Sequence, residues 1–149
     1  VGDGSYLMLN SEIATSVMLG LKLTVVVLDN RGYACINRLQ QACGGESFNN
    51  LLQNCHTVEA GAPKTDFAAH AKALGAESEK VSCLADLEAA LARAKVSNQT
   101  YVIAMDTDPM PSTQDGGAWW DVAVPEVSTR DEVVKAVRQY KVSKQQQPY

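Results

Sequence analysis

The sequence predicts an α/β fold, with an open, mainly parallel sheet and crossover helices on both of its faces. The first reason is a pair of continuous apolar runs, "LTVVVLDN" at residues 23–30 and "TYVIAMDTD" at residues 100–108. These runs lack the alternation of a half-exposed strand, so each is typical of a strand covered on both faces. The second reason is that the segments between such runs have apolar residues at helical spacing. Strands that alternate with helices in this way form parallel βαβ units.

The first βαβ unit begins at the amino terminus. Val1 is typical of the last residue of a strand, and residues 2–4 (GDG) are predicted to form a tight turn after it. A helix follows, with Asn10 or Ser11 as its N-cap. Because Val1 has the character of a strand end, we expect the fold to be truncated at its N-terminus and the chain to be the C-terminal portion of a larger protein.

The later elements follow from the same signals. Residues 44–65 are predicted to be a loop region that is mobile or covers a ligand. In chain order the elements are a short helix at 34–42, a helix that Thr65 or Asp66 caps and that ends at Gly75, a short strand at 80–82, an amphipathic helix at 83–96 and the strand at 100–108.

Two regions are expected within the chain. Residues 1–108 form the α/β core, and residues 109–149 form a C-terminal extension with little periodicity at its start. The stretch "TRDEVVKAVRQYK" at 129–141 predicts a last helix, capped by Thr129, and the final residues of the chain are expected to be disordered.

Composition excludes several classes of partner. The chain has 149 residues, a net charge of −4 and scattered Lys and Arg, so it has no basic field to attract nucleic acid or an anionic membrane. No apolar run approaches the roughly 20 residues that span a bilayer. The cysteines form no pair at the spacing of a zinc site; they are Cys35, Cys43, Cys55 and Cys83. We therefore expect a cytoplasmic protein with reduced thiols and with neither nucleic acid nor membrane as a partner.

Three residues at the predicted carboxyl edge of the sheet have the chemistry of a magnesium site. Asp3 and Asn30 each come just after a strand, and ligands of open α/β sheets bind at this edge. Their side chains offer hard oxygen ligands, and a turn at Gly32 aims a backbone carbonyl at the same point. Mg²⁺ completes its coordination shell with phosphate oxygens, and a nearby helix start favours an anion. Each signal alone indicates only a turn, but together they favour binding of a Mg²⁺-diphosphate.

The stretch "GDGSYLMLNSEIATSVMLGLKLTVVVLDNRGY" at residues 2–33 resembles the signature of thiamine-diphosphate-dependent enzymes. In that signature GDG precedes a helix, an apolar strand and an Asn, and here Asn30 follows Asp3 by 27 residues. The stretch "DFAAHAKALGAESEKVSCLADLEAALARAKVSNQTYVIAMDTD" at 66–108 resembles the later part of the diphosphate-binding domain. The resemblance covers most of the chain and implies the fold of that C-terminal domain.

The resemblance also implies thiamine diphosphate and Mg²⁺ as cofactors. The metal ligands that it implies are Asp3, the Asn30 side chain and the Gly32 carbonyl. The cofactor-binding residues that it implies are Gly2, Asp3, Gly4, Ser5, Asn30, Gly32 and Tyr33, with the backbone around Gly4 and Ser5 contacting the diphosphate. The family usually has Asn-Asn where this chain has Asp29-Asn30, which leaves the ligand in place. The family's activating Glu comes from another domain, so no catalytic residue is assigned in this chain.

Three segments, "SYLMLNSEIATS", "DNRGYACINRLQ" and "GGAWWDVAVPEVSTRDEV", are similar to the trihydroxycyclohexanedione hydrolases of myo-inositol catabolism. This resemblance implies hydrolysis of a C–C bond in a cyclic 1,2-diketone. The pyruvate decarboxylase branch has a catalytic carboxylate three residues after the motif Tyr, where this chain has Ile36. Cys35 and Ile36 are candidate substrate-side residues. Glu46 and His56 are weaker candidates, and Trp119 and Trp120 are expected to anchor packing or an interface.

Two alternatives remain open. An acetolactate synthase-like or 2-oxo acid decarboxylating lyase uses the same scaffold. A non-catalytic nucleotide-binding module uses a generic doubly wound fold, although the chain has no GxGxxG or GxxxxGK[ST] loop. As part of an enzyme, the chain holds half of an active site. We therefore expect it to be inactive alone, to contact partners through the face that meets other domains, and to belong to a homo-oligomer, a dimer or tetramer.

Overall fold

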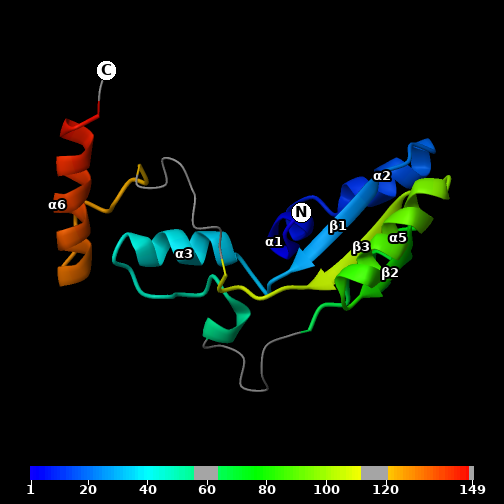
Figure 1. Cartoon of the computed structure of the whole chain (residues 1–149), viewed down its shortest axis with the longest axis horizontal. Coiled ribbons are helices and arrows are strands. Elements are labelled where there is room, and N and C mark those ends of the chain that lie inside the picture. The colour runs from blue at the N-terminus through cyan, green and yellow to red at the C-terminus, as the bar shows by residue number, and fades with distance from the viewer. Residues whose placement is uncertain (56–63, 112–120, 148–149) are drawn as a thin grey trace.

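The computed structural model describes residues 1–55, 64–111 and 121–147. A three-stranded parallel sheet lies toward one end of the molecule (Figure 1), in the order β1-β3-β2. The strands are β1 (Thr24–Asp29), β2 (Glu77–Val81) and β3 (Tyr101–Asp106). The register pairs Asp29 with Asp106 and Val81 with Met105, so all three strands end at one edge.

Helices connect the strands and extend the chain at its carboxyl end. They are α1 (Asp3–Met8), α2 (Ser11–Leu19), α3 (Ala34–Ala42), the 3₁₀ turn η1 (Leu52–Asn54), α4 (Phe67–Ala73), α5 (Leu84–Val96) and α6 (Asp131–Gln145). The cap predicted for the α4 helix is confirmed, because Asp66 Oδ1 accepts a hydrogen bond from the Ala69 amide at 2.9 Å.

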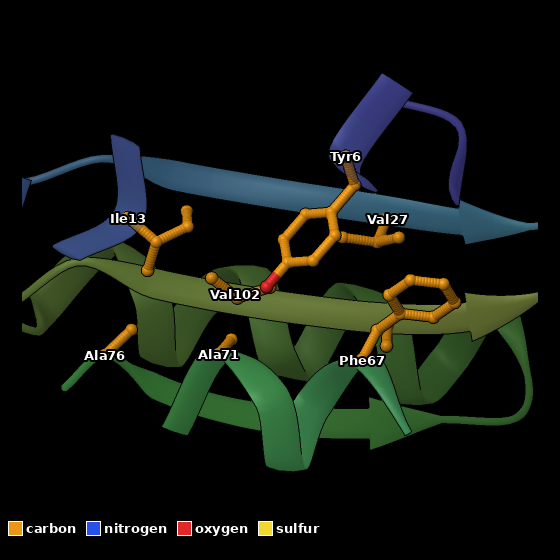
Figure 2. Packing of buried hydrophobic residues seen from close by; sticks show 8 residues of the cluster. Tyr6, Ile13, Val27, Phe67, Ala71, Ala76 and Val102 are labelled. Carbon is orange, nitrogen blue, oxygen red and sulfur yellow. The ribbon is translucent and has the colours of Figure 1, made fainter. Parts of the chain in front are cut away.

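The helices cover both faces of the sheet, as the sequence predicts. On one face, residues of α1, α2 and α4 pack against β1 and β3 (Figure 2). The Tyr6 ring meets Phe67 edge-on, with 5.4 Å between the ring centroids, and its hydroxyl lies 3.0 Å from His70 Nδ1. On the opposite face, Ala90 and Ala94 of α5 pack against the sheet. These two clusters form the hydrophobic core on the two faces of the sheet.

The strands differ in how far the helices bury them. β3 is the central strand, and its Val102, Ile103 and Ala104 are buried, as its continuous apolar sequence predicts. β1 is less covered than predicted: Val27 is buried, but Leu28 is 41% exposed. The reason is that β1 has β3 as a full neighbour on one side and only a short bridge from Gly2 on the other.

The amino terminus confirms one prediction and corrects another. Val1 lies beside β1, because its carbonyl accepts a hydrogen bond from the Leu28 amide at 2.8 Å, so it has the role of a strand end. The GDG segment, however, is not a separate tight turn. Gly2 is the N-cap of α1, and Asp3 and Gly4 are already helical. An acidic residue in the first turn stabilises a helix start, which explains why the helix begins there.

Two further element bounds differ from the predictions. β2 spans Glu77–Val81 rather than 80–82, because an edge strand tolerates polar residues on its open side. The N-cap of α6 is Arg130 rather than Thr129, and the Ser128 hydroxyl accepts a hydrogen bond from the Arg130 amide at 3.1 Å.

The C-terminal helix α6 lies away from the sheet, beyond α3 (Figure 1). Arg130, at its start, donates from Nε to the Gly44 carbonyl at 2.8 Å and pairs with the Glu46 carboxylate. The extension is therefore fastened to the loop after α3. Its division from the core at residue 108 stays a prediction.

Across the described ranges, the helices are too short or too polar for any of them to cross a membrane.

Candidate functional site

The carboxylate of Asp3 lies at the carboxyl edge of the sheet, where the turn after β1 closes over α1. Asp3 is 4% exposed. Its Oδ2 accepts a hydrogen bond from the Gly32 amide at 2.7 Å, and its Oδ1 accepts a longer one from the Asn30 amide at 3.4 Å. The structure therefore brings together all three residues that the sequence nominates as metal ligands.

The side chain of Asn30 tests whether a metal fits here. One of the two terminal atoms of its carboxamide, which is either the oxygen or the nitrogen, lies 2.7 Å from the Gly32 carbonyl oxygen and 3.1 Å from Asp3 Oδ1. With nitrogen at this position, the amide donates to both oxygens; with oxygen there, three oxygens converge with no proton between them. Neighbouring ligands of an octahedral Mg²⁺ lie about 3 Å apart, given ligand distances of about 2.1 Å. The donor set and its spacing fit a hard divalent cation.

The turn at residues 30–32 is fixed by hydrogen bonds to each of its amides. Besides the two that Asp3 accepts, the Arg31 amide donates to Asp29 Oδ1 at 2.9 Å. Gly32 has a φ of 141°, and a Cβ there would lie 2.3 Å from the Asn50 carbonyl oxygen. Only glycine fits, which explains why this position can bring its carbonyl so close to Asn30.

Tyr33 closes the site on the side of α1. A Cβ on Gly4 would lie 2.5 Å from the ring of Tyr33, so glycine lets the ring lie directly over the first turn of α1. The backbone of Tyr33, which carries the ring, is fixed by a hydrogen bond that its amide donates to the Asn50 carbonyl at 2.6 Å. Gly32 also bridges to Leu51, which is buried, so the segment after α3 braces the turn.

A cavity of about 420 Å³ opens beside Asp3. Its wall includes Asp3, Gly4, Gly32 and Tyr33, which the sequence nominates, together with residues that it does not. The residues that were missed include Asp29, Arg31, Asn49, Asn50, Leu52, Lys64, Lys80 and Asp106. Lys80 and Asp106 are at the ends of β2 and β3, the same kind of position that singled out Asn30, so that signal could have found them.

Burial raises the pKa of the Asp3 carboxyl above its ordinary value. The amides of Gly32 and Asn30 oppose this shift, and the negative charge of Asp29 adds to it. Among the described residues, no Lys or Arg forms an ion pair with Asp3; the cavity's Arg31 and Lys80 pair instead with Asp106, at 3.3 and 2.9 Å. A cation would supply the missing counter-charge to Asp3.

Several nominated residues lie elsewhere. Gly2 caps α1, and Ser5 is exposed in its first turns. Cys35 and Ile36 are exposed on α3, and neither belongs to the wall of the cavity. Their substrate-side role stays a prediction. The Glu46 carboxylate pairs with Arg130, and His56, Trp119 and Trp120 lie outside the described residues.

Known proteins are similar to this chain in sequence and in fold. Residues 1–105 match the family described as thiamine pyrophosphate enzyme, C-terminal TPP binding domain. The chain belongs to this family. Membership in this TPP-binding family confirms the resemblance found at residues 2–33.

Curated relatives match nearly the whole chain. The 3D-(3,5/4)-trihydroxycyclohexane-1,2-dione hydrolases of Halalkalibacterium halodurans and of Bacillus cereus strain AH820 are 38% and 39% identical to it over 99% of its length. The hydrolase of Geobacillus thermodenitrificans is 37% identical over 93% of the chain. The chain spans 22–23% of the length of these relatives.

Solved structures of TPP enzymes have the same fold. The thiamine diphosphate-dependent 4-hydroxybenzoylformate decarboxylase of Rhodococcus jostii RHA1 matches with a TM-score of 0.62 and 18% identity, over 72% of this chain and 19% of its own. Benzoylformate decarboxylase of Polynucleobacter necessarius matches with a TM-score of 0.57 and 26% identity, over 75% of this chain and 19% of its own. The predicted α/β architecture is thereby confirmed.

Proposed function

We propose that the chain holds the diphosphate and Mg²⁺ of thiamine diphosphate in a C–C bond hydrolase. The observation that carries this proposal is the convergence of the Asp3 carboxylate, the Asn30 carboxamide and the Gly32 carbonyl beside a cavity of about 420 Å³. In this proposal the Asp3 carboxylate, the Asn30 amide oxygen and the Gly32 carbonyl are the protein ligands of Mg²⁺. The backbone around Gly4 and Ser5 contacts the diphosphate, and Gly2 and Tyr33 complete the set of cofactor-binding residues.

Thiamine diphosphate, when bound, supplies a carbanion that adds to a substrate carbonyl and then stabilises charge while a C–C bond breaks. This chain's residues hold and orient the charged end of the cofactor. The group that activates the aminopyrimidine is expected from another domain, across a subunit interface. The active enzyme is therefore a homo-oligomer of a longer protein, in the cytoplasm, and this chain alone is inactive.

The reaction that we propose is hydrolysis of a cyclic 1,2-diketone in inositol catabolism. It adds the hydroxyl of water to one carbonyl carbon and hydrogen to the other, so that the ring opens to a carboxylic acid and an aldehyde. The support comes from relatives named trihydroxycyclohexanedione hydrolases, whose match covers 99% of the chain. Their likeness thus continues beyond residue 105, where the family match ends.

A second candidate is a 2-oxo acid decarboxylating lyase, because the solved structures that share the fold are decarboxylases. These structures match only 72% and 75% of the chain, and one of them is only 18% identical to it. They therefore give weaker support for a substrate class than the relatives do.

The test is an assay of the full-length enzyme, with thiamine diphosphate and Mg²⁺, on trihydroxycyclohexanedione and on 2-oxo acids such as benzoylformate. We expect ring opening to an acid, dependent on both cofactors. Release of CO₂ from 2-oxo acids without ring opening would establish the decarboxylase instead. Calorimetry that shows binding of adenine nucleotides and not of thiamine diphosphate would support the nucleotide-binding module.

A further inference from the structure

The turn at residues 30–32 includes a backbone conformation that its sequence does not favour. Arg31 has a φ of 61°, in the left-handed region where a residue with a Cβ is strained. Strained conformations of this kind persist only where their surroundings fix them, and they gather at functional sites. Arg31 stands directly between two of the proposed metal ligands, Asn30 and Gly32.

Backbone contacts hold Arg31 on both sides. Its amide donates to Asp29 Oδ1 at 2.9 Å, the bond to the residue two positions on that an Asp side chain favours in turns. Its carbonyl accepts a hydrogen bond from the Leu52 amide at 3.0 Å. These contacts orient the peptide groups but leave the side chain of Arg31 unexplained.

The side chain of Arg31 ties the turn to the neighbouring strand. Its Nη2 lies 3.3 Å from Oδ2 of Asp106, the last residue of β3, which is paired in register with Asp29. Lys80, near the end of β2, reaches the other oxygen of Asp106 at 2.9 Å. The turn directly follows β1, and the Asp106 carboxylate connects it to the ends of the other two strands, β3 and β2.

We propose that Arg31, through its ion pair with Asp106, is a positioning residue for the Gly32 carbonyl and the Asn30 side chain. The inference rests on the proposed function of these two groups as Mg²⁺ ligands. Because Arg31 lies between them, a rotation of its backbone toward ordinary φ values would redirect both ligands. Anchoring the side chain at the end of β3 opposes that rotation.

The test uses the full-length enzyme with Arg31→Gly, Asp106→Asn and the double variant. Glycine adopts a φ of 61° without strain, so Arg31→Gly removes the tether without forcing the turn into another conformation, although glycine also makes the backbone more flexible. Asp106→Asn removes the same tether and leaves the backbone of the turn unchanged. Titration calorimetry gives the Mg²⁺ concentration for half-maximal binding of thiamine diphosphate. We expect each single variant to raise it roughly three- to fivefold, as for an ion pair of moderate exposure, and the double variant to raise it no further. Arg31→Lys should restore part of the loss.

The matched control is Glu79→Gln, which breaks the ion pair between Glu79 and Arg93, outside the cavity. It should leave the Mg²⁺ requirement unchanged. Unchanged Mg²⁺ requirements in Arg31→Gly and Asp106→Asn, or effects that add in the double variant, would overturn the inference. A variant that lowers the melting temperature of the cofactor-free enzyme but leaves the Mg²⁺ requirement unchanged would also overturn the inference. If the wild-type enzyme itself binds thiamine diphosphate without Mg²⁺, the proposed function has failed instead.

Discussion

The carboxylate of Asp3 accepts a hydrogen bond from the backbone amide of Gly32, at 2.7 Å and across 29 residues of sequence. This bond joins the first residue of α1 to the turn after β1, so the two ends of the sequence motif are locked together in the protein itself. The three residues of the proposed metal site therefore lie together before a cation or diphosphate arrives, and the Asn30 amide needs only to turn its oxygen inward, which lowers the cost of ordering the site on binding.

Gly32→Ala tests whether this turn is fixed by close packing. The added Cβ would meet the Asn50 carbonyl oxygen at 2.3 Å, at a φ of 141° that alanine avoids. We expect a loss of roughly 1–3 kcal/mol of stability, seen as a lower melting temperature of the full-length enzyme, together with weaker cofactor binding. Gly2→Ala is the stability control, because a Cβ there has nothing within 4 Å. Equal melting temperatures for the two variants would contradict this account of the turn.

Thr100→Val tests a buried polar contact at the opposite edge of the sheet. The Thr100 hydroxyl lies 2.7 Å from that of Ser16, and it also accepts a hydrogen bond from the Leu23 amide at 3.1 Å. Valine keeps the shape but leaves the Leu23 amide unpaired, so we expect a loss of roughly 1–3 kcal/mol in thermal unfolding. Ser16→Ala should cost less, because it leaves that amide bonded. A larger loss for Ser16→Ala would show that the serine dominates.

Glu79→Gln tests the pH dependence of stability. The hydrogen bond from Arg93 lowers the pKa of the Glu79 carboxyl, and the Tyr101 hydroxyl, at 2.6 Å, lowers it further. A lowered carboxyl pKa stabilises the fold above the unfolded-state pKa, and this contribution is lost as pH falls through the folded-state value. Because the pair is partly exposed, we expect wild type to exceed the variant by at most about 1 kcal/mol at neutral pH.

The measurement for Glu79 is the melting-temperature difference between wild type and Glu79→Gln, at about pH 7 and about pH 3. The difference should shrink at the lower pH, because there the carboxyl takes up a proton in the unfolded chain, and the advantage of its lowered folded-state pKa diminishes. A difference that stays constant between the two pH values would show that packing, rather than charge, accounts for it.

The sequence predicted the α/β architecture, because local patterns such as the apolar runs of β1 and β3 carry this information. The resemblance at residues 2–33 linked Asp3 to Asn30, and the structure brings these two residues together, while their role as metal ligands stays a proposal. The prediction of a tight turn at residues 2–4 was wrong, since a Gly-rich segment is typical of a turn, and here its Asp3 and Gly4 belong to α1. Lys80 and Asp106 lie at strand ends, a signal that the sequence carries and that was not used for them. Their contact with Arg31 could not be predicted, because it depends on strand order and register, which one sequence does not reveal.

The central claim is that Asp3 binds Mg²⁺ and thereby the diphosphate, and Asp3→Asn in the full-length enzyme tests it most directly. Asparagine keeps the shape of the side chain but removes the charge, and burial already raises the pKa of this carboxyl, so the cofactor-free fold should tolerate the change. Titration calorimetry should show that the wild-type enzyme binds thiamine diphosphate only with Mg²⁺. At the same Mg²⁺ concentration, the affinity of the variant for thiamine diphosphate should be at least tenfold weaker, a loss of about 1.4 kcal/mol or more. Unchanged Mg²⁺-dependent affinity in Asp3→Asn would contradict the assignment.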